Sequence, residues 1–410
     1  MPLLDAVVAT LARLAGAEPP AYPSAAAMQA GEAALARRSL ELFGADPTGP
    51  YSRIMVTLPS EAASEPALLH ELIAAGGDCM RINCAHDGAA AWAAMIAHAR
   101  SAAAALGRSC PILMDLGGPK CRIVELRADQ ERPRLHRGDR LSLRRQLADG
   151  PARGIAATTN VPEVLASLRP GHEVWIDDGK LGARVIAAGR DAVELEVHIA
   201  GAKGVRLRPG KGVNFPDAEL SLPPLTDKDL TDLDFVARHA DMVGYSFVQR
   251  PEDVAWLQRE LLARCPERPL PALVLKVETR LAVRNLPDLI VAAGGREPVA
   301  VMLARGDLAV ELGFGRLSEI QEQILWICEA AHVPVIWATQ VLEGLIKDGA
   351  PARADATDAA MAQRAECVML NKGPHIVEGV RFLDDVLRRM DRHQTKKTAR
   401  LGPLRWWRAG

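Results

Sequence analysis

Eight short apolar runs recur along this chain and constrain its fold more than any other feature. They are continuous rather than alternating in polarity, which is typical of parallel strands buried on both faces, and a helical pattern follows each of them. Eight strand–helix units predict an α/β fold, a closed (β/α)₈ TIM barrel, rather than an open doubly wound sheet. The runs are Arg53–Leu58, Asp78–Asn83, Pro111–Leu116, Asp241–Phe247, Leu273–Glu278, Pro298–Ala304, Pro334–Thr339 and Glu366–Asn371.

The alternation is interrupted once, between the third and fourth runs. From residue 118 to about 218 the sequence changes to short alternating stretches with many glycines and prolines, which predicts a small inserted antiparallel β-domain. Thr226, with Asp229 three residues later, then predicts a capped helix start. We expect a helical extension over 1–50, barrel residues over 51–117 and 219–395, an inserted β-barrel lid over 118–218 and a basic tail over 396–410.

Composition and charge exclude several classes of function. The formal net charge is −1, so no overall field favours nucleic acid or a membrane surface. The seven cysteines contain no C-x-x-C pair, which indicates reduced thiols rather than a disulfide framework or a zinc site. The N-terminus lacks a basic region, and no apolar run is long enough to span a bilayer. We therefore expect a cytoplasmic protein without nucleic-acid or membrane partners.

Polar side chains gather where the expected strands end, which is where barrel enzymes carry their reacting groups. Side chains two apart on a strand share a face, so Arg81 and Asn83 are expected to point together. Single charged residues at strand ends often form only ion pairs that close a barrel, but polar residues at five strand ends favour a site. They are Arg81, Asn83, Asp115, Lys276, Glu278, Arg305, Asp307, Thr339 and Gln340.

Two carboxylates follow neighbouring runs and predict a divalent-metal site. Glu278 and Asp307 could supply two oxygen ligands to one Mg²⁺ or Mn²⁺, whose remaining positions substrate oxygens and water would fill. Lys276 shares a strand face with Glu278. Its ammonium group beside such a metal would stabilise an enolate or a phosphoryl group in transfer.

Several strings in this sequence resemble pyruvate kinases, and they follow in that family's order. RINCAHD is similar to R-L-N-F-S-H-G, and DLGGPKCR to D-T-K-G-P-E-I-R. DDGKLGARV, KGVNFP, LPPLTDKDLTDLDF, LKVET, MLARGDLAVE, PVIWATQVLEGLIK and PARADATD come after them. The resemblance runs from about Arg53 to Asp358 and includes the insertion. It implies a phosphotransferase that converts phosphoenolpyruvate and ADP to pyruvate and ATP through a metal-stabilised enolate.

The resemblance also implies roles for individual residues. Glu278 and Asp307 would hold the metal, and Lys276 would stabilise the phosphoryl group and the enolate. Thr339 would lie near the face where enolpyruvate gains a proton, and Arg81 would meet phosphate. The substrate site would comprise Ala304, Arg305, Gly306 and Thr339, and the nucleotide site Arg81, Asn83, Arg122 and Lys211.

Lys211 would reach the nucleotide when the inserted domain closes as a lid. The alternative is a solvated lysine in a glycine-rich turn. Asp178, in the string IDDG, is expected to be a turn residue rather than a nucleotide contact.

One departure from the family concerns the monovalent cation. Family members that need K⁺ have Ser where this chain has Ala85, and Glu where it has Lys120. We therefore expect the Lys120 charge to substitute for K⁺, at a site with Asn83 and Asp115, so that K⁺ is not required. The alternative is a surface lysine without this role.

Other departures leave the acceptor of the phosphoryl group open. TLPSEA replaces T-L-G-P-A-S, Leu116-Gly117 replaces Thr-Lys, and Asn371 to His375 replace the start of S-G-E-T-A-K-G. A metal-dependent lyase or aldolase acting through a pyruvate enolate, a kinase with another acceptor, and a non-catalytic binding protein remain alternatives. The family's C-terminal domain is not expected here, so any homo-oligomer would differ from the usual tetramer.

Overall fold

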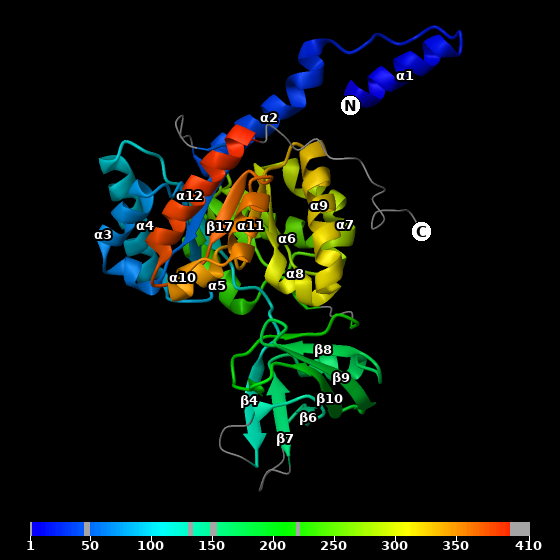
Figure 1. Cartoon of the computed structure of the whole chain (residues 1–410), viewed down its shortest axis with the longest axis vertical. Helices are drawn as coiled ribbons and strands as arrows, with labels where there is room; N and C mark the ends of the chain where they lie inside the picture. Colours follow the sequence, from blue (N-terminus) through cyan, green and yellow to red (C-terminus); the bar gives the residue numbers. More distant parts are fainter. Residues whose placement is uncertain (1, 45–49, 130–133, 148–153, 219–221, 394–410) are drawn as a thin grey trace.

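The computed structural model describes residues 2–44, 50–129, 134–147, 154–218 and 222–393. Eight parallel strands close into a barrel in the order β1-β17-β16-β15-β14-β13-β3-β2, which confirms the predicted TIM barrel (Figure 1). The expected basic tail over 396–410 lies outside the described residues. The barrel strands are β1 (Arg53–Thr57), β2 (Cys79–Asn83), β3 (Ile112–Asp115), β13 (Met242–Tyr245), β14 (Ala272–Val277), β15 (Val299–Ala304), β16 (Val335–Ala338) and β17 (Cys367–Leu370).

Helices surround the barrel. The segment that follows β1 forms two helices, the 3₁₀ helix η1 (Ser60–Ala63) and α3 (Pro66–Ala74), because Pro66 suits a first helical position and not an interior one. Thr226 and Asp229 form the predicted capping box. The remaining barrel helices are α4 (Ala89–Ala105), α5 (Asp227–His239), α6 (Pro251–Arg264), α7 (Arg280–Gly294), α8 (Arg305–Leu312), α9 (Phe314–Ala330), α10 (Glu343–Asp348), α11 (Arg353–Ala362) and α12 (Ile376–His393).

The inserted domain, residues 118–218, lies between β3 and α5, and therefore inside the third strand–helix unit. Its main sheet has the order β12-β8-β9-β10-β6-β7-β4, and a bridge between Arg122 and Gly212 joins its two edges. Strands β6 and β7 pair in parallel, whereas a purely antiparallel domain was expected. The elements are β4 (Ile123–Ala128), β5 (Arg134–Leu135), β6 (Arg140–Arg144), β7 (Ile155–Thr159), η2 (Pro162–Ser167), β8 (Glu173–Ile176), β9 (Leu181–Ala188), β10 (Ala192–Ala200), β11 (Val205–Arg206) and β12 (Val213–Asn214).

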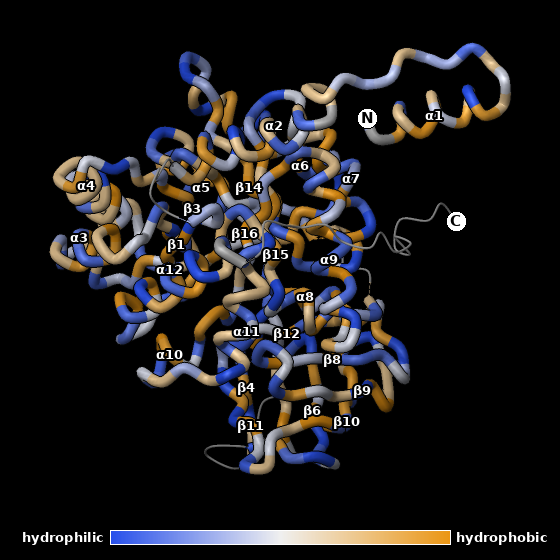
Figure 2. The backbone as a smooth tube through the Cα atoms, turned by 45° about the horizontal axis from the view of Figure 1, so that its top comes forward, coloured by the Kyte–Doolittle hydropathy of each residue, from blue (hydrophilic) through white to orange (hydrophobic). Residues whose placement is uncertain are grey.

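The N-terminal helices α1 (Pro2–Leu14) and α2 (Ala25–Phe43) differ in their relation to the barrel. Helix α2 brings Leu42 and Phe43 into an apolar cluster with residues of all eight barrel strands, among them Met55 and Leu113. Helix α1 projects away from the barrel body (Figure 1). The strands at the barrel centre are strongly apolar (Figure 2), as their buried positions require. No helix among the described residues combines the length and apolar character needed to cross a membrane.

Candidate active site

The first part of the site is an ion pair between neighbouring strands at the carboxyl end of the barrel. Strands β2 and β3 pair in parallel, and this register sets Arg81 opposite Leu113, two residues before Asp115. The Arg81 guanidinium donates to Asp115 Oδ2 from Nε at 2.8 Å and from Nη2 at 2.5 Å, and to Thr57 Oγ1 at 3.1 Å. Both charged groups are buried, so each depends on the other for compensation.

Lys276 lies at the centre of the site, and its side chain is surrounded by oxygen atoms. Its ammonium group donates to Ser246 Oγ at 2.6 Å. It also lies 3.2 Å from Asp115 Oδ1 and 3.2 Å from Glu278 Oε1. Lys276 is only 8% exposed. The arrangement confirms that Lys276 and Glu278 share a strand face, and it fixes a buried positive charge at the barrel mouth.

The pKa values of this cluster follow from burial opposed by opposite charges. Burial acts against the ionised form of Asp115, but Lys276 and Arg81 outweigh it and lower the pKa of this carboxyl. Burial likewise acts against the Lys276 ammonium, but Asp115 and Glu278 raise its pKa above the usual value. For Glu278, burial dominates over the attraction of Lys276, and its pKa is raised. Asp115 and Lys276 therefore remain charged near neutral pH.

The two predicted metal ligands stand on neighbouring parts of the barrel mouth. Glu278 follows β14 and accepts a hydrogen bond from the Phe247 amide at 2.6 Å through Oε2. Asp307 lies in the first turn of α8, directly after β15, and its Oδ1 accepts from Lys120 Nζ at 2.8 Å. Strands β14 and β15 are paired, which brings these carboxylates to the same side of the mouth.

The chemistry of this donor set fits a divalent cation. Both carboxylates offer hard oxygen atoms, as Mg²⁺ and Mn²⁺ prefer. Within the described residues, no group of three or more His, Cys, Asp or Glu side chains could enclose a metal ion. Two carboxylates supplemented by substrate and water oxygens are therefore the arrangement that these residues could offer.

The predicted substrate loop is held by the side chain of Arg305. Its guanidinium donates to the carbonyl oxygens of Ala338 at 3.0 Å and Thr339 at 2.7 Å, and pairs bidentately with Asp358 on α11. It also lies 4.6 Å from the centroid of the Trp337 ring. With the side chain thus engaged, the amides that begin α8 are the groups left to face a ligand, because first-turn amides have no intrahelical acceptor.

Thr339 lies against this loop in an uncommon backbone conformation. Its φ is +72°, a left-handed value that is rare for a β-branched residue. A Cβ atom at Gly306 would lie 2.7 Å from Thr339 Cγ2, so only glycine fits beside Thr339 at this distance. The structure therefore places Gly306 beside Thr339, and their joint part in a substrate site stays a prediction.

The predicted nucleotide residues come from both the barrel and the inserted domain. Lys211 pairs with Asp177 at 2.7 Å inside the inserted domain, and Arg122 donates to the Gly210 carbonyl oxygen at 3.0 Å. Asn83, in the barrel, accepts from the Ala85 amide at 3.0 Å. Arg122 and Lys211 thus belong to the inserted domain, whereas Arg81 and Asn83 belong to β2 of the barrel.

Lys120 is paired with two carboxylates. Its ammonium group contacts Asp307 at 2.8 Å and Asp178 at 3.5 Å, across the junction between barrel and inserted domain. The expected grouping of Lys120 with Asn83 and Asp115 stays a prediction. Asp178 has a φ of +53°, which agrees with the expected turn.

Sequence reasoning missed several residues that complete the site. Ser246 accepts from Lys276 and donates to the Leu116 carbonyl oxygen at 2.7 Å, and it directly follows β13. Its position at a strand end was the signal that could have revealed it. Thr57 ends β1 and carried the same signal, whereas Asp358 offered none, because its role depends on a contact with Arg305 from another element.

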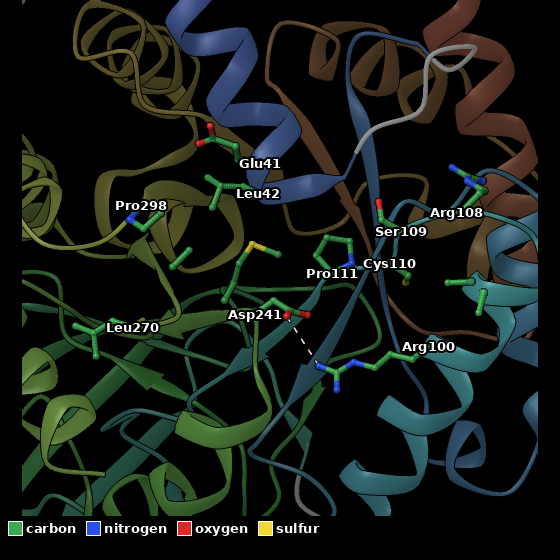
Figure 3. A pocket seen from close by; sticks show the side chains of 14 residues that line it. Glu41, Leu42, Arg100, Arg108, Ser109, Cys110, Pro111, Asp241, Leu270 and Pro298 are labelled. Atoms are coloured by element: carbon green, nitrogen blue, oxygen red, sulfur yellow. Dashed lines mark ion pairs between the residues drawn. The ribbon is translucent and has the colours of Figure 1, made fainter. Parts of the chain in front are cut away.

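A separate cavity of about 520 Å³ lies at the opposite, amino end of the barrel (Figure 3). The end of α2 and the segments before β3, β13 and β14 line it, with Glu41, Arg100 and Asp241 among its polar residues. Arg100 lies 3.9 Å from Asp241, so these charges already compensate each other. This cavity is distinct from the site around Lys276.

Comparison with known proteins agrees with the geometry at the barrel mouth. Residues 50–374 match the model of the pyruvate kinase barrel domain. The chain belongs to the pyruvate kinase family. It is similar to a pyruvate kinase of Agrobacterium vitis (32% identity, 84% of this chain and 70% of the relative). A pyruvate kinase of Methylorubrum extorquens is also 32% identical, over 83% of this chain and 69% of the relative.

A pyruvate kinase of Geobacillus stearothermophilus is 30% identical over 83% of this chain and 57% of its own length. As a member of the pyruvate kinase family, the chain is a phosphotransferase enzyme. The family accounts for the barrel with an inserted domain, which the sequence pattern had predicted. Membership of this family also suggests, in general, that the reaction depends on a divalent cation.

Proposed function

We propose that this pyruvate kinase relative transfers the phosphoryl group of phosphoenolpyruvate to ADP with Mg²⁺ or Mn²⁺ and without a requirement for K⁺. The observation that carries the proposal is the Lys276 ammonium group, buried between Asp115 and Glu278 at the carboxyl end of the barrel. A fixed charge in a site with little water stabilises charge that develops in a transition state far better than the same charge in bulk water.

The chemistry requires one bond to break and one to form. The bond between phosphorus and the enol oxygen of phosphoenolpyruvate breaks, and a terminal oxygen of ADP bonds to phosphorus. The electron pair stays on the enolate oxygen. Lys276 is proposed to stand beside the moving phosphoryl group and this oxygen, where its positive charge opposes the negative charge that both carry.

Glu278 and Asp307 are proposed to hold the divalent cation. Bound there, the ion would neutralise phosphate charge and polarise the enolate oxygen. Glu278 is already oriented by the Phe247 amide, and Asp307 by the start of α8. Preoriented carboxylates lose less conformational freedom on binding, which favours this pair as ligands.

Thr339 is proposed to lie on the face of the enolate that receives a proton. The hydroxyl group, directly or through a water molecule, would deliver that proton to the methylene carbon and leave pyruvate. Ala304, Arg305 and Gly306 would meet the substrate carboxylate through backbone amides at the start of α8, where the helix dipole favours an anion.

Arg81, Asn83, Arg122 and Lys211 are proposed to meet the nucleotide phosphates. Because Arg122 and Lys211 belong to the inserted domain, closure of that domain over the barrel would bring them to Arg81. Closing would also exclude water from the reacting phosphate. This division between two parts of the chain supports a reaction with two substrates.

Independence from K⁺ is proposed from Ala85 and Lys120. Ala85 offers no hydroxyl ligand, and Lys120 brings a permanent ammonium charge to the Asp307 side of the mouth. The ammonium group of Lys120 would supply at this place the positive charge that a bound monovalent cation otherwise provides. The proposal predicts equal turnover when tetramethylammonium replaces K⁺.

The deciding experiment is a coupled assay for pyruvate from phosphoenolpyruvate and ADP, with Mn²⁺ or Mg²⁺, with and without K⁺. We expect turnover that depends on the divalent ion but not on K⁺, and a loss of at least about 100-fold in kcat for Lys276→Met. The exposed lysine variant Lys347→Met is the matched control and should retain full activity.

An absence of turnover with ADP would contradict the proposal. Proton exchange into pyruvate would then separate two cases. Metal-dependent exchange without phosphoryl transfer would favour a lyase or another phosphoryl acceptor, as the altered segment from Asn371 to His375 allows. Metal binding with neither reaction would favour a non-catalytic binding protein.

A further inference from the structure

Helix α8 links the barrel mouth to the inserted domain. Asp307 lies in its first turn, and Glu311 follows four residues later on the same face. Glu311 Oε1 accepts a hydrogen bond from Asn214 Nδ2, on β12 of the inserted domain, at 3.4 Å. A Cβ atom at Gly179 of the inserted domain would lie 3.2 Å from Val310 Cγ2, so the two parts are in close contact here.

A second contact lies beside the first. Arg280, at the start of α7, donates from Nε to the Glu311 carbonyl oxygen at 2.6 Å. Its Nη1 lies 3.6 Å from Asp217 Oδ1 of the inserted domain. Arg280 therefore connects the backbone at Glu311 with the segment that follows β12. Glu311 and Arg280 together form a small polar contact between barrel and inserted domain.

The surroundings of Glu311 disfavour its negative charge. The side chain is partly buried at the contact, and burial raises its pKa to about 7. The hydrogen bond from Asn214 and the positive charge of Arg280 lower the pKa of Glu311. The negative charges of Asp307 and Asp217 raise it further. Lys120 faces Asp307 from the inserted domain and offsets part of that carboxylate's charge. These are the charged groups around Glu311 from the elements packed against it.

We infer that Glu311 is a positioning residue that fastens the inserted domain to α8, and that it does so best when its carboxyl carries a proton. The protonated acid keeps the hydrogen bond from Asn214 and removes the repulsion from Asp217. The inference rests on the proposed function, because a reaction divided between barrel and inserted domain needs the two held together. Glu311 acts on that reaction through domain position and not by contact with substrate.

The direction of the pH dependence follows from linkage. A glutamate exposed to water has a pKa near 4.3, so opening of the contact would return Glu311 toward that value. Docking therefore takes up a proton and is favoured below about pH 7. As the pH rises from 5.5 to 8, the ratio of docked to open molecules should fall roughly tenfold or more.

Domain position can be measured without substrate, nucleotide or metal. Spin labels would be attached at Arg190→Cys in the inserted domain and Asp288→Cys on α7, both exposed positions, with Cys110→Ser to remove the partly exposed native thiol. Pulsed electron–electron double resonance gives the distribution of distances between the two spin labels. We expect a short-distance population that declines from pH 5.5 to pH 8.

Glu311→Gln is the decisive variant, because its amide cannot ionise and still accepts from Asn214. It should keep the short-distance population unchanged across the same pH range. Glu252→Gln, at an exposed position on α6, is the matched control and should retain the wild-type profile. Asn214→Ala removes the donor and should lower the short-distance population at every pH.

In the assay for pyruvate, Glu311→Gln should retain kcat at pH 7 and flatten the rise of KM above pH 7. Identical distance profiles for wild type and Glu311→Gln would overturn the inference. If Glu311→Gln does not fold, as circular dichroism would show, an unchanged Asn214→Ala profile would overturn it. A pH-dependent distance without phosphoryl transfer would support Glu311 as a fastening residue and reject the proposed function.

Discussion

The Lys120 ammonium group lies 2.8 Å from Oδ1 of Asp307, a carboxylate proposed to bind the metal. Lys120 comes from the start of the inserted domain, before β4, and Asp307 from the barrel. Both side chains are 19% exposed, so water screens this pair only partly. In the protein without metal, the lysine compensates the charge that a divalent cation would compensate in the loaded enzyme.

Lys120→Met should therefore strengthen metal binding to the free protein. The cation would no longer compete with an ammonium group for Asp307, nor meet its repulsion. We expect the dissociation constant for Mn²⁺ to fall about fivefold, which corresponds to about 1 kcal/mol. Titration followed by the electron paramagnetic resonance signal of free Mn²⁺ measures it. Lys347→Met should leave the constant unchanged, and weaker binding by Lys120→Met would contradict the competition.

Gly306→Ala should disturb the position of Thr339. The new methyl group would lie 2.7 Å from Thr339 Cγ2, closer than van der Waals contact allows. We expect proton exchange into pyruvate to fall at least tenfold while Mn²⁺ affinity changes little. Exchange is followed by loss of methyl protons in deuterium oxide.

The double variant Gly306→Ala with Thr339→Ser tests the cause. Serine retains the hydroxyl group but lacks the methyl group that the new alanine meets. Recovery of exchange in the double variant would attribute the loss to this one contact. If the double variant is as slow as Gly306→Ala, the defect lies in the backbone of the substrate loop instead.

Periodicity explains which parts of this architecture could be predicted. Lys276 and Glu278 are two apart on one strand, so their common direction follows from local geometry. The closed barrel followed from eight continuous apolar runs. The partners of Lys120 could not be predicted from the sequence, because the contact with Asp307 depends on how the inserted domain packs against α8. The same limit applies to Arg305, whose side chain contacts Asp358 and two carbonyl groups that are distant in the sequence.

Asp115→Asn should reduce stability in a way that depends on pH. Lys276 and Arg81 hold the pKa of Asp115 below the value it has in the unfolded chain. The contribution to stability is therefore complete above about pH 4 and is lost as the pH falls through the lower folded-state pKa. Because Asp115 is 1% exposed, removing its charge should cost about 3 kcal/mol at pH 7.

Urea unfolding at pH 7, 5 and 3.5 measures the difference in unfolding free energy between wild type and Asp115→Asn. We expect that difference to shrink toward the lowest pH, where wild-type Asp115 begins to gain a proton as well. Asp288→Asn, at an exposed position, should show little difference at any pH. A difference that stays constant from pH 7 to 3.5 would show that packing, and not charge, is responsible.

Phe43→Ala should destabilise the barrel from the end opposite the active site. Phe43 is fully buried in an apolar cluster with residues of the barrel strands, although it belongs to α2 and not to the barrel. Removing its ring should cost about 3–5 kcal/mol in unfolding free energy, measured by urea denaturation. Leu14→Ala, at a position 80% exposed on α1, should change the unfolding free energy by no more than about 0.5 kcal/mol.

Because Lys276 lies at the other end of the strands, kcat of the folded Phe43→Ala protein should stay near the wild-type value. A loss of stability below about 1 kcal/mol would mean that α2 does not close the barrel in solution.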